Sequence, residues 1–485
     1  MTQKARMEGI TFPDGQTGST FLRQVMAQAL EQFPGEFSGL ELPSEKAFKK
    51  HYSEAVVRFE AARVASPRRS EIAQFIVNYT HDQLVYKTES GSTPWRDYIK
   101  GAAPSVTLES HEFKGKPGFV PGVTFHGRAY QGASLPYLGQ KLLAEQKITG
   151  AVAKALNWVQ QVAKNQGGAI DLSGQKFVIL GASAELAPTP LLLQAGASVL
   201  WIDVQGPDAY LATPQKYAGR LSHSPEARNI LLQPREIKAA IEAFAAGEPV
   251  HVAMFAYAAG ASQEWRLAAT MNALVMELSP EIVGSVTMLI SPTSAATVQP
   301  EDFARSLENK RKPPLWQSAL KTIGALGASC SYDQAGIPIA RAIVPLQGAS
   351  YQAAQYISKT LAAEVLANYG VGNRKGQGPL RVSANVAGIT KTKSLQHPVF
   401  QAAFLGAEAF GVEIFEVPCT RALSTLLMVH DLFNPDAFPK TEMSQIFAQQ
   451  VHGGIYSRAF ALDPMIRIAT MMGLVKQPQL LLKLM

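Results

Sequence analysis

Short apolar runs alternate with helical stretches through the second two thirds of the chain. The runs Lys176–Leu180 and Ser198–Ile202 are separated by a turn and a short helical segment, and Asp203 follows the second run. Apolar runs of this length are typical of strands that are buried on both faces of a parallel sheet. Similar runs follow at residues 251–256, 283–290, 381–386 and 412–417. The sustained alternation predicts an α/β fold with a doubly wound, mostly parallel sheet.

The pattern outside this sheet indicates further units. Apolar residues at helical intervals predict helices before residue 90, and residues 138–163 predict a long helix that links this region to the sheet. We therefore expect a mixed N-terminal domain at 1–170, the sheet domain at 171–435 and a helical C-terminal extension at 436–485. Residues 299–346 carry several prolines and a charged stretch, which indicates a lid-like insertion within the sheet domain.

A glycine turn joins the first strand to the next helix at Gly181–Pro188. A strand that enters such a turn places backbone N–H groups and the positive end of a helix where a pyrophosphate can bind. Asp203 lies about twenty positions further on, where an acidic residue accepts from a ribose hydroxyl. The pattern predicts a Rossmann-type site for NAD, and NADP is less expected because its 2′-phosphate would meet this carboxylate. Glu185, however, adds bulk and negative charge where a second glycine would stand.

Five segments occur in the order known from one enzyme family. The last of them follows an Arg-Val-Asn-Ala-Val-x-Pro-Gly-x-x-x-Thr pattern, with its Gly388 and Thr392 in register. On these segments the chain, from about residue 172 to 428, resembles the short-chain dehydrogenase/reductase superfamily. The segments are Gly181–Ser183, Phe255–Gly260, Trp265–Asn272, Leu289–Ser291 and Arg381–Thr392.

The resemblance implies a set of cofactor-binding residues. Thr392 would hold the nicotinamide carboxamide, although it could also be a helix N-cap for the segment after it. The residues implied to bind the dinucleotide are Gly181, Ser183, Leu186, Asp203, Gly260 and Thr392.

The resemblance also implies a catalytic tyrosine with a supporting lysine. Tyr351 precedes a predicted helix over 352–369, as the catalytic tyrosine of the family does. Four residues later, where one helical turn would bring the lysine, the chain has Gln355, and the nearest lysine is Lys359. Enoyl reductases of the superfamily also separate the two residues more widely. Tyr356 is a competing phenol because it lies closer to the lysine.

Two further residues complete the implied catalytic set. Ser291 ends a strand where the family keeps the serine that holds the substrate oxygen, with Thr293 and Ser294 as alternative hydroxyls on the same turn. Asn272 would take part in a proton relay, or would only bridge neighbouring helices.

Composition narrows the class of protein. Charged residues make up 17% of the chain, against roughly 25% in typical soluble domains, which favours extensive burial and a homo-oligomer. The net charge of +7 is spread along the sequence without a basic stripe, so we expect no nucleic-acid partner. The nine histidines are scattered and the two cysteines lie far apart, so we expect neither a metal site nor a disulfide framework. No membrane span and no signal peptide are predicted, which favours a cytoplasmic location.

The sequence thus predicts an NAD(P)-dependent oxidoreductase. It would act on a carbonyl, alcohol or activated alkene of an apolar small-molecule substrate, with tyrosine as the proton donor or acceptor. Two alternatives stay open. One is a non-redox lyase or dehydratase on the same fold, and the other is a degenerate member that binds a ligand or partner without turnover.

Overall fold

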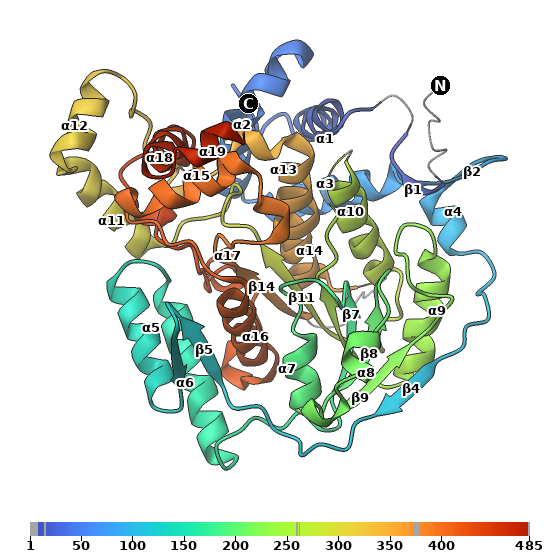
Figure 1. Ribbon diagram of the computed structural model, residues 1–485. Coiled ribbons are helices and arrows are strands. Elements are labelled where there is room, and N and C mark those ends of the chain that lie inside the picture. Colours follow the sequence, from blue (N-terminus) through green and yellow to red (C-terminus); the bar gives the residue numbers. More distant parts are fainter. Residues whose placement is uncertain (1–7, 14–15, 259, 261, 372–378, 484–485) are drawn as a thin grey trace.

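A seven-stranded sheet forms the centre of the protein in the computed structural model, which describes residues 8–13, 16–258, 260, 262–371 and 379–483 (Figure 1). All neighbouring strands run parallel except the pair at one edge, so the prediction of an α/β fold with a mostly parallel sheet is confirmed. In spatial order the strands are β14 (Arg381–Val386), β11 (Val283–Ile290), β10 (Val250–Met254), β7 (Lys176–Leu180), β8 (Ser198–Ile202), β9 (Arg220–His223) and the antiparallel β4 (Glu109–Glu112).

The strand order reverses beside β7. The chain runs outward from β7 through β8 and β9, and then returns to β10 on the other side of β7. In open parallel sheets, ligands bind in the crevice outside the carboxyl ends of the strands at such a reversal. Gly181, directly after β7, has a φ of +92°, and a Cβ there would lie 2.2 Å from the backbone nitrogen of Ala256. Glycine therefore lets the ends of β7 and β10 approach closely.

Side chains along the central strands alternate between two cores. Val178 and Leu180 of β7 belong to one core, whereas Phe177 and Ile179 belong to the other, as expected because successive strand residues point to opposite faces. The first face is covered mainly by α1 (Gly18–Gln32), α2 (Glu45–Ala65), α3 (Arg69–Asp82), α9 (Pro234–Ala245), α10 (Gln263–Met276), α13 (Ala349–Gln355) and α14 (Ala362–Tyr369). The second is covered by α5 (Ser134–Ala144), α6 (Gly150–Asn165), α7 (Thr189–Gln194) and α16 (Val417–Phe433).

The N-terminal third of the chain wraps around this sheet. Its helices α1 to α3 lie on one face, α5 and α6 lie on the other, and its strand β4 forms the edge beside β9 (Figure 1). The N-terminal helices share continuous cores with the strands that follow them. The domain boundary expected at residue 170 stays a prediction.

The prediction of one long helix over 138–163 is wrong, because the chain forms two helices there, α5 and α6. The chain turns back between α5 and α6 at Gln146, which has a φ of +60°. Thr149 then forms the N-cap position of α6, and its hydroxyl donates to the carbonyl of Ala448 at 2.7 Å. The run at 412–417 is likewise not a strand, since α16 begins at Val417.

The predicted insertion at 299–346 forms two helices and a hairpin. The hairpin is tied to the chain after β11 through the N–H of Val298, which donates to the carbonyl of Pro338 at 2.9 Å. The elements are α11 (Pro300–Arg311), α12 (Leu315–Thr322), β12 (Ser331–Gln334) and β13 (Ile337–Ala340). Whether this segment moves as a lid stays a prediction.

Smaller elements complete the fold. They are β1 (Gly9–Thr11), β2 (Val85–Thr88) and β3 (Gly91–Pro94) in one antiparallel sheet, β5 (Gly122–Phe125) and β6 (Arg128–Gln131) in another, and the short helices α4 (Trp95–Ile99), α8 (Asp208–Leu211), α17 (Met443–Ile446) and α19 (Gln479–Leu482). Among the described residues, no helix has the length and apolar character needed to cross a membrane.

Two glycines let helices α15 (Pro398–Ala407) and α18 (Leu462–Lys476) cross at close range. A Cβ on Gly406 would lie 1.9 Å from the carbonyl oxygen of Ala469, and one on Gly473 would lie 1.8 Å from that of Ala402. Each helix therefore packs a glycine directly against the backbone of the other. This pair of helices forms one wall of the pocket described below.

Gly473→Ala should lower the free energy of unfolding by about 1–3 kcal/mol, because the added methyl group forces the two helices apart. Alanine is the better helix former, so a loss of stability would identify the crossing as its cause. Gly150→Ala is the matched control, since a Cβ there meets nothing within 4 Å at the start of α6. Urea denaturation of both variants measures the difference, and equal stabilities would contradict this account.

Candidate functional site

The helix predicted after Tyr351 is continuous but contains a π-helical turn. It consists of α13, the π turn η3 (Tyr356–Leu361) and α14. In an α-helix, residues seven apart lie on the same face, and a π turn takes up one additional residue. Lys359, eight positions after Tyr351, therefore lies near the face that carries Tyr351, about two turns further along. The π turn thus accounts for the wide spacing of the two residues.

The Tyr351 hydroxyl reaches the loop that follows β11. Burial raises its pKa, and hydrogen bonds with Ser291, Thr293 and Gln347 oppose this effect without outweighing it. The carboxylate of Glu264, at the start of α10, adds to the rise. The phenol is therefore protonated at neutral pH, and Tyr351 is suited to donate a proton to a substrate oxygen.

Side chains of α13 hold the loop after β11 in place. The backbone N–H of Ser291 donates to Gln355 Oε1 at 3.1 Å, and Gln352 Nε2 donates to the carbonyl of Thr293 at 2.8 Å. The hydroxyls of Ser291 and Thr293 lie 2.9 Å apart, and the Thr293 hydroxyl donates to Gln347 Oε1 at 2.9 Å. Gln355, which stands where the family pattern has a lysine, thus positions the serine loop.

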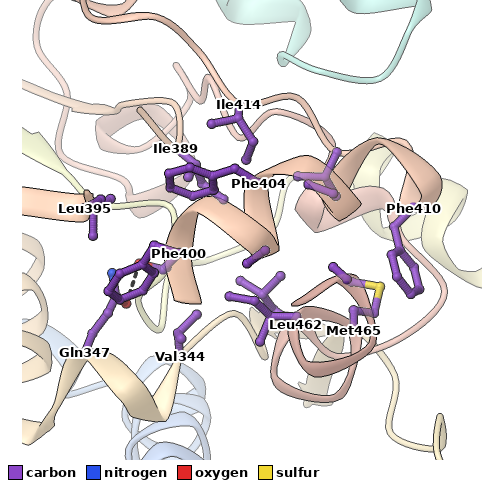
Figure 2. Close-up of a pocket in the computed structure, with 16 residues that line it drawn as sticks. Val344, Gln347, Ile389, Leu395, Phe400, Phe404, Phe410, Ile414, Leu462 and Met465 are labelled. Carbon is purple, nitrogen blue, oxygen red and sulfur yellow. Dashed lines mark hydrogen bonds between the residues drawn. The ribbon is translucent and has the colours of Figure 1, made fainter. Parts of the chain in front are cut away.

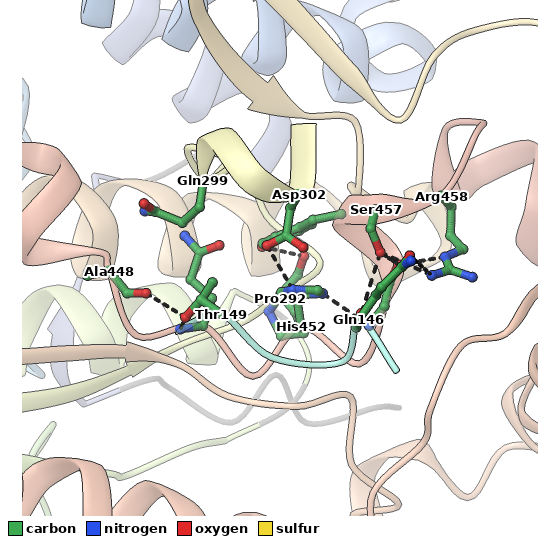
Figure 3. Close-up of polar contacts among 12 residues, drawn as sticks. Gln146, Thr149, Pro292, Gln299, Asp302, Ala448, His452, Ser457 and Arg458 are labelled. Carbon is green, nitrogen blue, oxygen red and sulfur yellow. Dashed lines mark hydrogen bonds and ion pairs between the residues drawn. The ribbon is translucent and has the colours of Figure 1, made fainter. Parts of the chain in front are cut away.

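A buried polar cluster supports the same loop from behind (Figure 3). The hydroxyl of Tyr456 donates to the carbonyl of Pro292 at 3.0 Å, and the ring of His452 stacks on Tyr456 at 5.1 Å between centroids. His452 Nδ1 accepts from the N–H of Gly454 at 3.0 Å, and its Nε2 lies 3.1 Å from Asp302 Oδ2. This cluster makes the turn between Ser291 and Thr293 rigid. Within the described part of the chain, no three His, Cys, Asp or Glu side chains are arranged to hold a metal ion.

Tyr356, the competing phenol, belongs to a structural network. Its hydroxyl donates to Glu60 Oε2 at 2.6 Å, and Arg63 pairs with Glu60 at 2.7 Å and with Glu364 at 2.8 Å. These side chains are almost fully buried. Burial raises the pKa of Tyr356 well above its ordinary value, and the neighbouring Glu60 carboxylate raises it further. The hydroxyl of Tyr356 is therefore used in a structural hydrogen bond, and Tyr351 is the phenol at the candidate site.

Lys359 is part of the π turn, and Asn272 contacts the same turn from α10. The side-chain amide of Asn272 donates to the carbonyl of Ser358, and its Oδ1 is buried without a partner among the described residues. Burial lowers the pKa of Lys359 to about 8, and among the described residues no charged neighbour counters this effect. An unpaired, partly buried ammonium group is suited to bind hydroxyl groups of a ligand.

The structure brings together four of the predicted cofactor-binding residues, Gly181, Ser183, Leu186 and Asp203. The N–H of Ser183 donates to Asp203 Oδ2 at 2.9 Å, and the N–H of Gln205 donates to Oδ1 at 3.0 Å, so Asp203 holds the turn that begins at Gly181. Leu186 lies partly buried in the same turn. Gly260 does not join this group in any contact seen here: it lies exposed in the loop before α10, with a φ of +91°.

Thr392 lies at the other side of the crevice, and Glu185 bridges the two sides. Thr392 is the N-cap residue of the short turn η4 (Lys393–Leu395), and its hydroxyl lies 3.0 Å from that of Ser394. Glu185 Oε2 accepts from the backbone N–H of Lys393 at 2.9 Å. Gly181, Asp203 and Lys359 therefore fit a nicotinamide dinucleotide, because they offer close backbone approach, a ribose acceptor and an unpaired cation. Glu185 is the one residue that opposes it.

An apolar pocket lies between α15, α18 and the segments near Val344 and Ile389 (Figure 2). It encloses about 560 Å³ of empty space, including its open mouth, and its only polar lining residues are Thr293 and Gln347 at one end. These are the residues that hydrogen-bond with Tyr351. The apolar lining includes Val344, Ile389, Leu395, Phe400, Phe404, Phe410, Ile414, Leu462 and Met465.

Several residues of the site were missed in the sequence. Gln347 and Glu264 reach Tyr351, and Tyr257, exposed after β10, hydrogen-bonds with Ser394. Burial raises the pKa of Tyr257 to about 12. No sequence spacing links these residues, because they come from separate loops that meet only in the folded chain.

Comparison with protein-family models gives no match to this chain, and comparison with curated proteins gives none either.

Lys359→Met should raise the free energy of unfolding at about pH 7 by about 1–3 kcal/mol, because a pKa difference of one unit corresponds to about 1.4 kcal/mol and partial exposure reduces the effect. The pKa of Lys359 is lowered from 10.5 to about 8 in the folded protein. The charged side chain therefore destabilises the fold fully below about pH 8, and this penalty disappears as pH rises to about 10.5.

Urea denaturation at about pH 7 and about pH 10.5 measures this difference. Lys359→Met should be more stable than the natural chain at the lower pH, and this gain in the free energy of unfolding should be lost at the higher pH. Lys391→Met is the control, since Lys391 is half exposed and pairs with Glu416 at 2.5 Å. A gain that stays constant with pH would contradict the account of Lys359.

Proposed function

We propose that this chain is an oxidoreductase of the short-chain dehydrogenase/reductase kind. It would use NAD, or less favourably NADP, and act on a carbonyl, alcohol or activated alkene of an apolar molecule. The observation that carries the proposal is the hydrogen bonding of Tyr351 with Thr293 and Gln347, the two polar residues among those that line an apolar pocket. A substrate whose chain fills the pocket would present its oxygen to the hydroxyls of Tyr351 and Thr293.

The polar end of the pocket is suited to protonate that oxygen. Ser291 and Thr293 would donate hydrogen bonds that orient it, and Tyr351 would transfer its proton to it, or remove one in the reverse direction. The phenolate that forms would accept a hydrogen bond from the side-chain amide of Gln347. The apolar walls would exclude water from the reacting end.

The dinucleotide would lie across the carboxyl ends of β7 and β10. Asp203 would accept from ribose hydroxyls, Lys359 would donate to the hydroxyls of the second ribose, and the turn after Gly181 would approach the pyrophosphate. When bound, the nicotinamide would supply or take up the hydride. Titration with NADH, followed by fluorescence, tests this assignment, and no binding at millimolar concentration would remove it.

Glu264 favours a second candidate function. Its carboxylate raises the pKa of both Tyr351 and Tyr257, so it lies within electrostatic reach of both phenols. A carboxylate and a protonated phenol at one apolar pocket could serve as base and acid in a non-redox elimination or hydration. Turnover of a hydroxy substrate without any dinucleotide would favour this lyase or dehydratase.

Exposed apolar side chains support the further proposal of a homo-oligomer. Leu315, Ile323, Val475 and Leu482 are each at least 74% exposed, and they lie on α12, its end, α18 and α19. Burial of such residues is a common reason for association. Light scattering of the purified chain would give the mass of the species in solution. A cytoplasmic location stays a proposal from the sequence alone.

Tyr351→Phe should lower turnover by about 100-fold or more, while NADH affinity stays unchanged, because the variant removes the proton donor and leaves the proposed dinucleotide contacts in place. Tyr356→Phe is the informative partner. It should lower the free energy of unfolding by about 1–3 kcal/mol, because Glu60 loses a buried hydrogen bond. Steady-state kinetics and urea denaturation of both variants separate the roles. Unchanged turnover in Tyr351→Phe would refute the assignment.

Ala403→Trp should raise KM for apolar substrates by roughly tenfold or more, because the indole would fill space that a substrate chain needs. Ala403 lines the pocket from α15, whereas Leu405 on the same helix is 38% exposed. Leu405→Trp is therefore the matched control and should leave KM unchanged. An equal effect of both substitutions would show that the substrate does not occupy this pocket.

A further inference from the structure

Two side chains link the loops at the carboxyl ends of the central strands. From the turn after β7, the Glu185 carboxylate accepts from the N–H of Lys393 at 2.9 Å. From the end of β10, the Tyr257 hydroxyl hydrogen-bonds with the side chain of Ser394. Both contacts fall on η4, the turn that follows β14. The loop that carries Thr392 is thus fastened across the place where a dinucleotide would enter.

The Glu185 contact satisfies a donor that would otherwise attract an anion. Lys393 is the first residue of η4, and the first N–H groups of a helical turn lack partners within it. Such groups favour negatively charged partners. A carboxylate of the chain itself therefore occupies the region between the turn after Gly181 and the loop of Thr392, where the pyrophosphate of a dinucleotide would lie.

The backbone of the turn is held separately from this side chain. The carbonyl of Glu185 accepts from Arg421 Nε at 2.7 Å, and Asp203 holds the N–H of Ser183 at 2.9 Å. The Glu185 side chain is partly exposed. It can therefore rotate towards solvent while the turn keeps its shape.

We propose that Glu185 sets the affinity of the crevice for dinucleotides by occupying the place of the pyrophosphate. This inference rests on the proposed function and concerns how dinucleotide binding would be regulated. The carboxylate must leave Lys393 before a pyrophosphate can approach, and its charge repels that group while it is near. The natural chain therefore binds NADH weakly, and a ligand without a diphosphate is not subject to this restriction.

Fluorescence titration with NADH tests the proposal on the full chain. Glu185→Ala should lower the Kd by roughly ten- to a hundredfold, which corresponds to the loss of one close like-charge contact. Glu185→Gln should give a smaller decrease, because the amide oxygen can still accept from Lys393 without the charge. Glu416→Ala is the matched control. It removes an equal charge beside the same loop, where Glu416 pairs with Lys391, and should leave Kd within about twofold of the natural chain.

Amide hydrogen exchange gives a readout that needs no dinucleotide. In the ligand-free Glu185→Ala variant the N–H of Lys393 should exchange faster, because it has lost its acceptor. Unchanged exchange would overturn the proposal, whatever the titration shows. Equal, measurable NADH affinity of the natural chain and Glu185→Ala would overturn it and leave the proposed function standing. Faster exchange without NADH binding by any variant would instead remove the dinucleotide from the proposed function, and with it the proposed regulation.

Discussion

The buried guanidinium of Arg63 fixes the element on which the candidate site depends. Its pairs with Glu60 and Glu364 join α2 to α14, and Glu60 also accepts from Tyr356 in the π turn. An ion pair of this kind contributes little net stability, because removing two charges from water offsets their attraction. Its geometry is nevertheless specific. With Tyr356 held against α2, the helix cannot rotate, and Tyr351 is directed to the opposite side, towards Ser291.

Several groups at the candidate site lower the stability of the fold. Lys359 is partly buried without a charged partner, and Asn272 leaves one buried oxygen without a partner among the described residues. The π turn interrupts the regular hydrogen bonding of the helix, and such turns are frequent at functional sites. Residues of this kind destabilise a fold unless a ligand or a reaction uses them. Lys359 and the π turn lie on the helix that carries Tyr351, and Asn272 contacts this helix from α10, which supports the assignment of this region to the site.

The sequence predicted the five strands β14, β11, β10, β7 and β8, because strands buried on both faces leave continuous apolar runs such as Lys176–Leu180. It missed β9 and β4 at the edge of the sheet, where all residues of β4 and some of β9 are exposed or partly exposed. It predicted the helix after Tyr351 from its length, but the π turn leaves no periodic signal. The break at Gln146 was missed because apolar spacing continues through it. The pocket was not predictable, since its walls come from segments near residues 344, 400 and 465 that meet only through tertiary packing. The role of Gln355 was equally hidden, because its partner is a backbone N–H 64 residues away.

Separate elements hold the two halves of the crevice. The reacting end depends on α13, the loop after β11 and the N-terminal helices, whereas the turn of Glu185 is held by Asp203 after β8 and by Arg421 on α16. A substitution at Glu185 therefore leaves the contacts of Tyr351 intact. Under the proposed function, the affinity for a dinucleotide could therefore change while the hydrogen bonds of Tyr351 are kept. This separation allows a chain to differ from the family pattern at Glu185 and still keep the surroundings of Tyr351.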